Sequence, residues 1–462
     1  MNFSFSELRK RHPRFIYHEY KYTLVKDRLR FAFNFEIEPN LHFFPQIEIK
    51  GIDKARLNTV GKDVLNNFAF QLGLTEIPSY WKATCSAEIV VNAGKLDEFQ
   101  QVWWKDLILR GMGEFFFVNQ IDFTTPDFLG FKSSQFSAGR EKIYTGELDN
   151  SRMLVPVAGG KDSALTCKLL KRGNKKILPF CLNPTKAALN IIQTCKIGNP
   201  IVANRRIDER LLKLNEMGYL NGHTPFSAYL AFLSAITSIL FATQTVLVSN
   251  ERSSNEGNTQ FNGFAINHQY SKSYEFETKF RQYCKKYLCE GLEFSSFLRP
   301  LYELQIAKIF SRFPAYFPLF KSCNVGQKTD SWCQKCAKCL FVFTVLYPFV
   351  KEEILCKKIF SENLFNQPEL ITKARKFLGG SEMKPFDCIG TKEETLVAFF
   401  MCWEKAKRTK RKLPAVLQAI ETEIMLKQHH LEKSKTAILS AWNKNHSLNN
   451  NLESLLRQEA DL

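Results

Sequence analysis

A glycine-rich turn at residues 158–163 (AGGKDS) is the strongest chemical signal in the sequence. It follows the apolar run 153–157 and opens a predicted helix, so backbone N–H groups and the positive end of the helix dipole face one point. The Lys161 ammonium and the Ser163 hydroxyl would add a charge and a donor, while Asp162 would cap the helix or help to hold Mg²⁺. This arrangement favours a bound phosphate group. The alternative is an ordinary strand-to-helix turn with a good cap, and the spacing excludes a Walker A loop.

A second set of residues has the spacing of a metal site. Its pattern is C-x9-C-x2-C-x2-C, formed by Cys323, Cys333, Cys336 and Cys339. Four thiolates this close together are what a tetrahedral zinc ion requires, so the pattern predicts a structural Zn²⁺. The alternatives are four independent reduced thiols, or Cys323 as a catalytic acid/base whose pKa nearby lysines lower. Because a closed zinc site has no open position for substrate, the zinc and catalytic interpretations of Cys323 exclude each other.

Polar side chains are dense between these two segments. Asn250 and Glu251 follow a predicted buried strand, 245–249, which places them at the ligand-bearing edge of a parallel sheet, beside a bound nucleotide. His223 precedes a buried helix, whose dipole favours a neutral imidazole. Three further polar residues alternate and would point the same way in an extended segment: His268, Tyr270 and Lys272. Each alone is more often structural, but together they are candidates for chemistry.

Two further segments carry weaker signals. In FLRPLYEL (297–304), Arg299 and Glu303 can clamp a carboxylate or phosphate of a substrate, or pair with each other on a helix face. The Gly-x-Gly-Glu sequence at 111–114 has no strand–helix unit around it, and a strand-like run follows it up to Asp122. That context makes it a weak signal for nucleotide binding.

The elements around the turn repeat in a strand–helix–strand order. Predicted strands over 153–157 and 176–182 flank a helix over 164–173, and a further strand is predicted over 200–208. This order predicts an α/β fold on a doubly wound parallel sheet. We expect three parts: an N-terminal α+β domain that is a candidate for substrate binding (1–145), a catalytic domain (146–345) and a helical C-terminal region with a basic tail (346–462). A polar, Gly-containing stretch over 134–152 marks the first boundary.

The composition is that of a folded chain. The 462 residues carry 64 Lys and Arg against 46 Asp and Glu, a formal net charge of +18, and 45% are hydrophobic, which excludes disordered and collagen-like proteins. The uncharged stretch 219–250 is predicted to be a buried helix (225–241) and a strand rather than a membrane span. Thirteen cysteines, and an N-terminus without an apolar signal-like run, indicate the reducing cytoplasm. The basic run 405–412 is typical of a solvated helix end, and we expect no stable nucleic-acid partner.

The turn at 158–163 resembles the Ser-Gly-Gly-x-Asp-Ser signature of the PP-loop pyrophosphatase superfamily, with Ala158 in place of the first serine. The resemblance implies ATP binding on a sheet of PP-loop type and AMP-forming activation of a carboxylate, an amide or a related oxygen. It assigns pyrophosphate binding to Gly159, Gly160, Lys161, Asp162 and Ser163. It also makes Asn183, at the end of the 176–182 strand, a candidate nucleotide contact. A similar cysteine group occurs in the members that make the 7-cyano-7-deazaguanine base.

Between about residues 110 and 400 the sequence contains a longer series of motifs, which in order read GGKDS, NEMGYLNGHTPFSA, SNERSSNEGN, NHQYSKSYEFE, LRPLYELQIA, SCN, WCQKCAKCLFVF and KPFDCIG. This series is similar to the UDP-N-acetyl-muramoyl-L-alanyl-L-glutamate epimerase family (MurL). The resemblance implies a bacterial, cytoplasmic isomerase of peptidoglycan synthesis. Such an enzyme inverts the terminal L-Glu of UDP-MurNAc-L-Ala-L-Glu, using ATP with Mg²⁺ and releasing AMP and diphosphate.

Inversion requires that a proton leave one face of the glutamate Cα and return to the other, so two acid/base groups or one mobile group are needed. Our candidates are His223, His268, Tyr270 and Lys272, with Arg299 as a substrate contact. One alternative is another AMP-forming PP-loop enzyme that acts on a tRNA base or a deazaguanine precursor. The other is a non-catalytic nucleic-acid-binding protein, which would bind RNA without turning over ATP.

Overall fold

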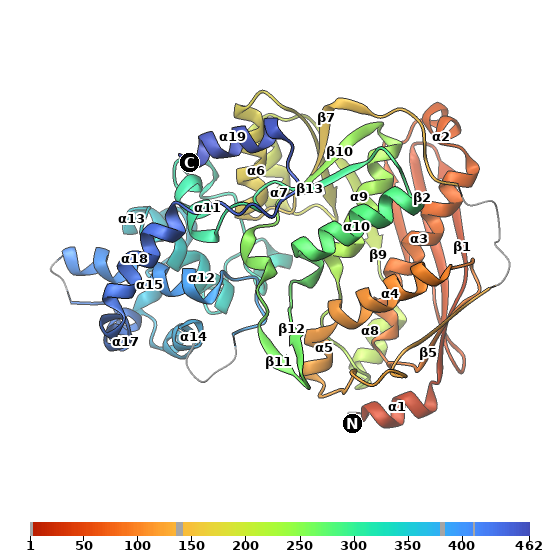
Figure 1. Cartoon of the computed structure of the whole chain (residues 1–462), viewed down its shortest axis with the longest axis horizontal. Coiled ribbons are helices and arrows are strands. Elements are labelled where there is room, and N and C mark those ends of the chain that lie inside the picture. Colours follow the sequence, from red (N-terminus) through yellow and green to blue (C-terminus); the bar gives the residue numbers. More distant parts are fainter. Residues whose placement is uncertain (1–2, 135–141, 379–383, 410–411) are drawn as a thin grey trace. The chain divides into compact units, whose positions relative to one another are not determined.

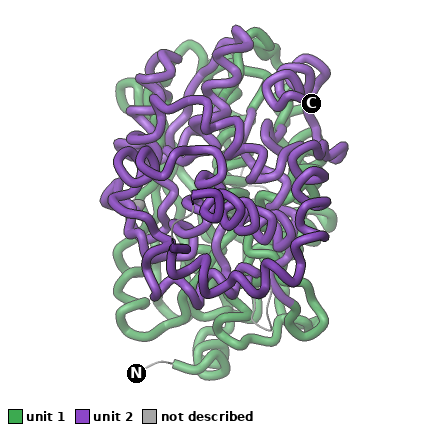
Figure 2. Tube along the Cα trace, turned by 90° about the vertical axis from the view of Figure 1, so that its left-hand side faces the viewer, with its two compact units in different colours: residues 1–154, 201–246, 260–294 green, residues 155–200, 247–259, 295–462 purple. Residues whose placement is uncertain are grey.

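The computed structural model describes residues 3–134, 142–378, 384–409 and 412–462 (Figure 1). The chain is an α/β protein with a large mixed sheet and a helical C-terminal region. It divides into two compact units, coloured separately in Figure 2. Unit 1 comprises residues 1–154, 201–246 and 260–294, and unit 2 comprises 155–200, 247–259 and 295–462. The residues of the predicted catalytic domain are therefore shared between the units, and segment 135–141 of the predicted boundary lies outside the described residues.

Unit 1 holds most of the strands, and three strands begin in it and end in unit 2. Its own elements are α1 (Phe5–Arg11), β1 (Arg14–Val25), β2 (Arg28–Ile37), β3 (Leu41–Phe43), β4 (Gln46–Lys50), α2 (Lys54–Val60), α3 (Lys62–Trp81), β5 (Glu88–Val91), α4 (Glu98–Gly111), α5 (Gly113–Val118), β6 (Gly130–Ser133), β9 (Ile201–Arg206), α8 (Glu209–Glu216), α9 (Phe226–Leu240), β12 (Phe264–Ile266), η2 (Tyr270–Lys272) and α10 (Tyr274–Tyr287). The three strands with ends in unit 2 are β7 (Asp149–Pro156), β10 (Thr243–Val248) and β13 (Glu293–Ser296).

The sheet of unit 1 is mixed. Its strands lie in the order β9-β4-β2-β1-β5-β6, with β3 beside β2. The pairs β1/β5, β5/β6 and β7/β10 are parallel, whereas β9/β4, β4/β2, β2/β1 and β2/β3 are antiparallel. The expectation of a parallel sheet is therefore met only in part, because the large sheet is mixed and mostly parallel, and Ala203 of β9 pairs antiparallel with Ile49 of β4. The alternating apolar residues of β2 do face the core, as the sequence pattern predicts.

Two local predictions in unit 1 are wrong. The strand-like run after Gly113 is the short helix α5, because its phenylalanines pack on a helical face rather than alternating across a strand. Residues 270–272 form the 3-10 helix η2, so the polar residues after His268 do not alternate along an extended segment. In both places the tertiary packing overrides a short local pattern.

The uncharged stretch 219–250 is a buried helix followed by a strand, as predicted. Helix α9 buries most of its residues, and strand β10 follows it directly. Within α9, Thr237 Oγ1 donates to Leu233 O at 2.7 Å. Among the described residues, no helix combines the length and the hydropathy that a membrane crossing would need.

Unit 2 begins at the end of β7 and contains the predicted chemical segments. Its elements are α6 (Lys161–Arg172), β8 (Lys176–Leu182), α7 (Lys186–Cys195), η1 (Arg252–Asn255), α11 (Glu303–Phe310), η3 (Pro314–Tyr316), η4 (Gly326–Thr329), α12 (Ala337–Leu346), α13 (Glu352–Ile354), η5 (Leu355–Ile359), η6 (Leu364–Asn366), η7 (Pro368–Leu370), α14 (Ile371–Phe377), α15 (Lys392–Arg408), α16 (Ala415–Ala419), α17 (Glu421–Leu426), α18 (Gln428–Leu439) and α19 (Asn450–Ala460). The first residue of the short strand β11 (Thr259–Phe261) belongs to unit 2, and its other residues belong to unit 1. The predicted strand–helix–strand unit around the turn is confirmed by β7, α6 and β8.

The helices of the C-terminal region pack on one another as the helical prediction requires. Helix α12 is buried along its length and contacts α11 and α15. The basic run 405–412 begins inside α15, where Lys405 Nζ donates to Val350 O at 2.7 Å and Lys407 pairs with Glu421 at 2.9 Å. These contacts agree with a helix end, and residues 410–411 lie outside the described part of the chain.

Candidate active site

The glycine-rich turn, residues 158–163, leads from strand β7 into helix α6. Gly159 has φ +92°, and a Cβ there would lie 2.9 Å from both the Ala187 Cβ and the Ala188 N of helix α7. Only glycine fits this conformation and this close approach. Gly160 is the N-cap of α6, so Asp162 does not cap the helix, and that alternative is wrong. Gly160 has no side chain with which to cap α6, and the N–H of Lys161, the first residue of the helix, donates to Ser322 Oγ at 3.3 Å.

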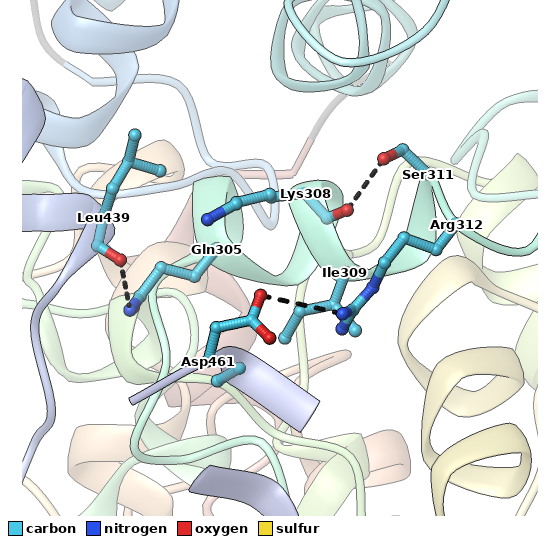
Figure 3. A pocket seen from close by; sticks show the side chains of 8 residues that line it. Gln305, Lys308, Ile309, Ser311, Arg312, Leu439 and Asp461 are labelled. Atoms are coloured by element: carbon cyan, nitrogen blue, oxygen red, sulfur yellow. Dashed lines mark hydrogen bonds and ion pairs between the residues drawn. The ribbon is translucent and has the colours of Figure 1, made fainter. Parts of the chain in front are cut away.

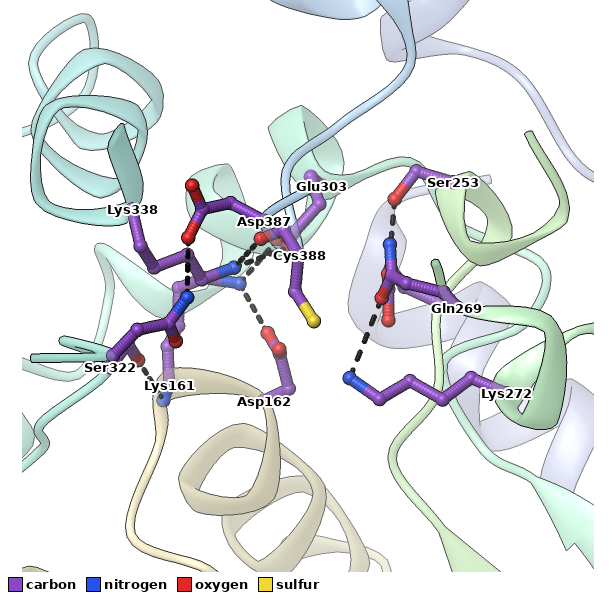
Figure 4. Close-up of polar contacts among 12 residues, drawn as sticks. Lys161, Asp162, Ser253, Gln269, Lys272, Glu303, Ser322, Lys338, Asp387 and Cys388 are labelled. Atoms are coloured by element: carbon purple, nitrogen blue, oxygen red, sulfur yellow. Dashed lines mark hydrogen bonds and ion pairs between the residues drawn. The ribbon is translucent and has the colours of Figure 1, made fainter. Parts of the chain in front are cut away.

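Lys161 is the charged centre of the turn. Its ammonium donates to Glu303 Oε2 at 2.6 Å and also contacts the Asp162 carboxylate, as Figure 4 shows. Burial would lower the pKa of Lys161, but the two carboxylates outweigh burial and raise it above the ordinary value. Lys161 is therefore a fixed cation, held by Glu303 at the start of α11.

A second lysine approaches the same carboxylate. Lys338 Nζ lies 3.8 Å from Glu303 Oε1 and also donates to the carbonyl of Cys388. Burial raises the pKa of Glu303, and Asp162 adds to the rise, while Lys161 and Lys338 oppose it. The result is a buried group of two cations and two carboxylates beside the turn.

The other predicted nucleotide residues follow strand ends of unit 2. Asn183, directly after β8, is exposed with φ +47°. Asn250 Nδ2 donates to Ser296 Oγ at 3.2 Å, and Glu251 is buried, with Oε1 accepting from Ser253 Oγ at 3.0 Å. Their position after β8 and β10 agrees with the predicted edge, and nucleotide contact by them stays a prediction.

Arg299 is fully buried and ties these strand ends together. Its Nη1 donates to Glu251 O at 2.8 Å and to Ser254 Oγ at 2.6 Å, and its Nη2 donates to Ser296 Oγ at 3.1 Å. The guanidinium thus orders the backbone after β10 and β13. Substrate binding by Arg299 stays a prediction.

The four predicted metal ligands converge. Sγ–Sγ distances are 3.9 Å for Cys323–Cys336, 3.8 Å for Cys333–Cys339 and 3.5 Å for Cys336–Cys339. Thiolates at about 2.3 Å from a tetrahedral zinc ion would be about 3.8 Å apart, so the group fits Zn²⁺.

Backbone N–H groups also point at the sulfurs. Gly326 N donates to Cys323 Sγ at 3.1 Å, Cys336 N to Cys333 Sγ at 3.3 Å and Cys339 N to Cys336 Sγ at 3.4 Å. Such donors stabilise negative sulfur. Together the four cysteines could hold a metal such as zinc.

In unit 1, two of the predicted acid/base residues share one carboxylate. Glu114 Oε2 contacts Nδ1 of His268 and lies 3.4 Å from Nδ1 of His223, and the two imidazole centroids are 4.5 Å apart. Burial lowers the pKa of His223 to about 3, and the positive charges of His268, Lys272 and Lys82 add to the effect. His223 is therefore a neutral imidazole at physiological pH. We call Glu114, His223 and His268 the Glu–His–His cluster.

The same three residues have donor atoms within 4.8 Å of one another, as a metal site would. The charges around them argue for a different ligand. Lys82 and Lys272 lie near enough to depress the pKa of His223, and Lys82 Nζ donates to Gly222 O at 2.9 Å. Two lysines beside the cluster disfavour a cation and favour an anionic group of a substrate.

Tyr270 and Lys272 are held by neighbours in unit 1. Tyr270 Oη donates to Asp106 Oδ2 at 3.0 Å and accepts from Lys279 Nζ at 3.3 Å, and burial raises the pKa of Tyr270 above its ordinary range. Lys272 Nζ donates to Gln269 Oε1 at 3.4 Å. A buried tyrosine that has a raised pKa and donates a hydrogen bond to a carboxylate is poorly suited to proton transfer at neutral pH.

A separate pocket of about 240 Å³ in unit 2 lies between α11, α18 and α19 (Figure 3). Arg312 and Lys308 line it, and the Arg312 guanidinium is 3.7 Å from Asp461 and 3.8 Å from Glu459. Because Arg312 is paired with the carboxylates of Glu459 and Asp461, its charge does not favour an anion in this pocket.

The sequence patterns assign no role to Glu114 or Lys338, and they do not predict that Glu303 pairs with Lys161. Lys338 lies between two predicted ligands, and Glu303 was assigned to substrate or to Arg299 rather than to Lys161. Glu114 belongs to the Gly-x-Gly-Glu sequence that was read as a weak nucleotide signal. Glu114 is the second residue of the short helix α5, and this position brings its carboxylate to His223 and His268.

Comparisons with known proteins find one family along most of the chain. The profile of the MurL N-terminal domain matches residues 6–297, and that of the MurL C-terminal domain matches 319–435. A protein of Salinispora tropica named UDP-N-acetyl-alpha-D-muramoyl-L-alanyl-L-glutamate epimerase is 37% identical over 267 residues, 56% of this chain and 57% of that protein. Proteins of the same name from a Micromonospora strain and from Xanthomonas oryzae are 33% and 28% identical, each over 71% of this chain and over 72% and 73% of their own lengths. No solved structure matches the chain.

Proposed function

This chain belongs to the MurL family, and we propose on that premise that it is a UDP-N-acetyl-α-D-muramoyl-L-alanyl-L-glutamate epimerase of peptidoglycan precursor synthesis. The observation that carries the proposal is the 33% identity to a so-named Micromonospora protein over 333 residues, 72% of that protein. The reaction that we propose for this chain inverts the terminal L-Glu of UDP-MurNAc-L-Ala-L-Glu to D-Glu. Because its substrates are peptidoglycan precursors, we expect the protein in the cytoplasm.

The first step that we propose is activation of the glutamate carboxylate by ATP. An ionised carboxylate resists loss of the α-proton, because deprotonation would build a second negative charge beside the first. Transfer of AMP to the carboxylate, with release of diphosphate, removes that charge and makes the α-proton more acidic. Attack of water on the mixed anhydride later releases AMP and restores the carboxylate.

The turn at 158–163 is the proposed diphosphate site, on a sheet of PP-loop type. The start of α6, with glycine as its N-cap, and the fixed Lys161 cation suit a polyphosphate, and Asp162 is the side chain that would hold Mg²⁺. Asn183, Asn250 and Glu251 follow strand ends, where the adenosine of such a site lies.

The Glu–His–His cluster is the proposed acid/base centre. Glu114 contacts both imidazoles through Nδ1 and so orients the two rings. Neutral His223 would take a proton, and His268, paired more tightly with Glu114, would deliver one. Lys82 and Lys272 would attract an anionic group of the substrate. Tyr270 is then a residue that supports η2.

One incubation tests the whole proposal. Purified protein, ATP, Mg²⁺ and UDP-MurNAc-L-Ala-L-Glu are combined in D₂O, and AMP, deuterium at the glutamate Cα and its chirality are measured. Deuterated D-Glu together with AMP supports activation followed by proton exchange. AMP without exchange points to a ligase-like reaction, and no AMP with this substrate directs the search to tRNA or deazaguanine substrates.

A further inference from the structure

The segment that carries the four cysteines also contacts the phosphate turn. We define the cysteine segment as residues 321–339 and the phosphate turn as 158–163; both belong to unit 2. We propose that metal binding to the cysteine segment holds the phosphate turn in its binding conformation, so that nucleotide affinity depends on metal occupancy. This inference rests on the proposed use of ATP.

The first contact lies next to the first metal ligand. Lys321 N donates to Gly159 O at 2.9 Å, and Lys161 N donates to Ser322 Oγ at 3.3 Å. The two cysteine-segment residues in these bonds, Lys321 and Ser322, are two residues and one residue from Cys323. A shift of Cys323 therefore moves groups that fix the two sides of Gly160.

The second contact is made by Asp330, between Cys323 and Cys333. Its two carboxylate oxygens accept from Lys186 N at 3.0 Å and Ala187 N at 3.2 Å, at the first turn of helix α7. This is the part of α7 that packs against Gly159. Asp330 thus fixes the helix turn on which the phosphate turn rests.

The third contact is ionic. Lys338, between Cys336 and Cys339, pairs with Glu303, and Glu303 pairs with Lys161 (Figure 4). The position of Lys338 depends on both flanking ligands. The Glu303 carboxylate therefore connects the metal site to Lys161, the cation of the phosphate turn.

The cysteine segment has little regular structure of its own to maintain these contacts. In the described backbone between Tyr316 and Ala337, the 3-10 helix η4 is the single regular element. Four thiolates bound to one ion would close this loop and order it. Without the ion, the loop regains conformational freedom, and the contacts made by Lys321, Ser322 and Asp330 weaken together.

The test separates metal binding from contact with the turn. Ser322→Ala and Asp330→Ala remove contacts but leave all four ligands, whereas Cys339→Ser removes a ligand. Cys356→Ser is the control, because Cys356 lies outside the cluster. For each full-length protein, zinc per chain, far-UV circular dichroism and the Kd for Mg²⁺–ATP without the sugar substrate are measured.

We expect the wild type and Cys356→Ser to hold one zinc ion and to bind ATP equally. Ser322→Ala and Asp330→Ala should keep zinc but raise the Kd about 5-fold to 10-fold, the effect of one lost hydrogen-bonded anchor. Cys339→Ser should lose zinc and raise the Kd more than 10-fold. Chelation of the wild type and reloading with Zn²⁺ gives the same comparison if Cys339→Ser does not fold.

Unchanged ATP affinity in Ser322→Ala and Asp330→Ala, or in the zinc-free wild type, would overturn the inference while leaving ATP use intact. A zinc-loaded wild type that binds no ATP would instead refute the proposed function. The two failures are distinguished by the ATP affinity of the zinc-loaded wild type: it binds ATP if only the inference fails, and it does not bind ATP if the proposed function fails.

Discussion

Lys161 donates to Glu303 at 2.6 Å, and each of these side chains is only 2% exposed. The sequence separates them by 142 positions, yet the start of helix α6 and the start of helix α11 place the cation and the carboxylate in contact. Burying such a pair is costly unless both charges are paired well, and here Asp162 and Lys338 complete the group. Its presence beside a helix start that has glycine as its N-cap is more consistent with a binding site than with stability alone.

Replacing Lys161 should damage both folding and ATP use, and a double variant separates the two effects. Lys161→Met leaves Glu303 buried and partly uncompensated, so the unfolding free energy should fall by about 3 kcal/mol. Lys161→Met/Glu303→Gln should recover most of that stability but still release no AMP. The measurements are urea unfolding and AMP release with the full substrate set. AMP release by the stable double variant would remove Lys161 from the ATP site.

Glu114→Gln should abolish most proton exchange without unfolding the protein. Glutamine keeps the size of the side chain but cannot stabilise a positive imidazole, so deuterium incorporation at the glutamate Cα should fall about 100-fold. Glu36→Gln is the matched control, because Glu36 pairs with His18 at 2.8 Å on strands β1 and β2. Equal rates in the two variants would show that the Glu–His–His cluster is structural.

Glu394 should make the stability of unit 2 fall as pH rises. Burial, with repulsion from Glu303, raises the pKa of Glu394 to about 8, although N–H groups of Thr391 and Leu304 donate to it. A carboxyl whose folded pKa lies above its unfolded value keeps its full contribution below the unfolded pKa and loses it as pH rises through about 8.

Wild-type protein should therefore lose on the order of 3 kcal/mol more than Glu394→Gln between pH 5 and pH 9. Chemical unfolding at the two pH values measures it. The control is Glu393→Gln, since Glu393 is on the same helix turn but is 56% exposed. Parallel losses in the wild type and Glu394→Gln would assign the pH dependence to other groups.

The local parts of the site were predictable, and the convergent parts were not. The turn, its flanking strands and the cysteine spacing are short-range patterns, and the structure has them where the sequence predicts. The pairing of Lys161 with Glu303, and the sharing of Glu114 by two histidines, depend on how distant helices pack. No local pattern encodes such packing, so Glu114 and Lys338 were missed.

The sheet shows the same limit. The alternation in β2 predicted a strand but not its partners, and β9 could be assigned to a parallel sheet only by analogy with its neighbours in sequence. Segment 113–118 is short and rich in phenylalanine, which suits a strand or a buried helix equally well. Such a segment takes the structure that its neighbours impose.

Gly159→Ala should reduce ATP binding more than it reduces stability. The residue has φ +92°, and its new Cβ would lie 2.9 Å from Ala188 N, so the turn must shift away from α7. Gly198→Ala is the matched control in unit 2: it has φ +89°, but its Cβ would meet nothing within 4 Å.

Both variants should lose about 1–2 kcal/mol of unfolding free energy from the strained backbone. Only Gly159→Ala should raise the Kd for Mg²⁺–ATP, by about 10-fold or more, because only there does the displaced backbone belong to the proposed phosphate site. Calorimetric titration with Mg²⁺–ATP and thermal unfolding provide the two measurements, and equal affinities for the two variants would place the diphosphate elsewhere.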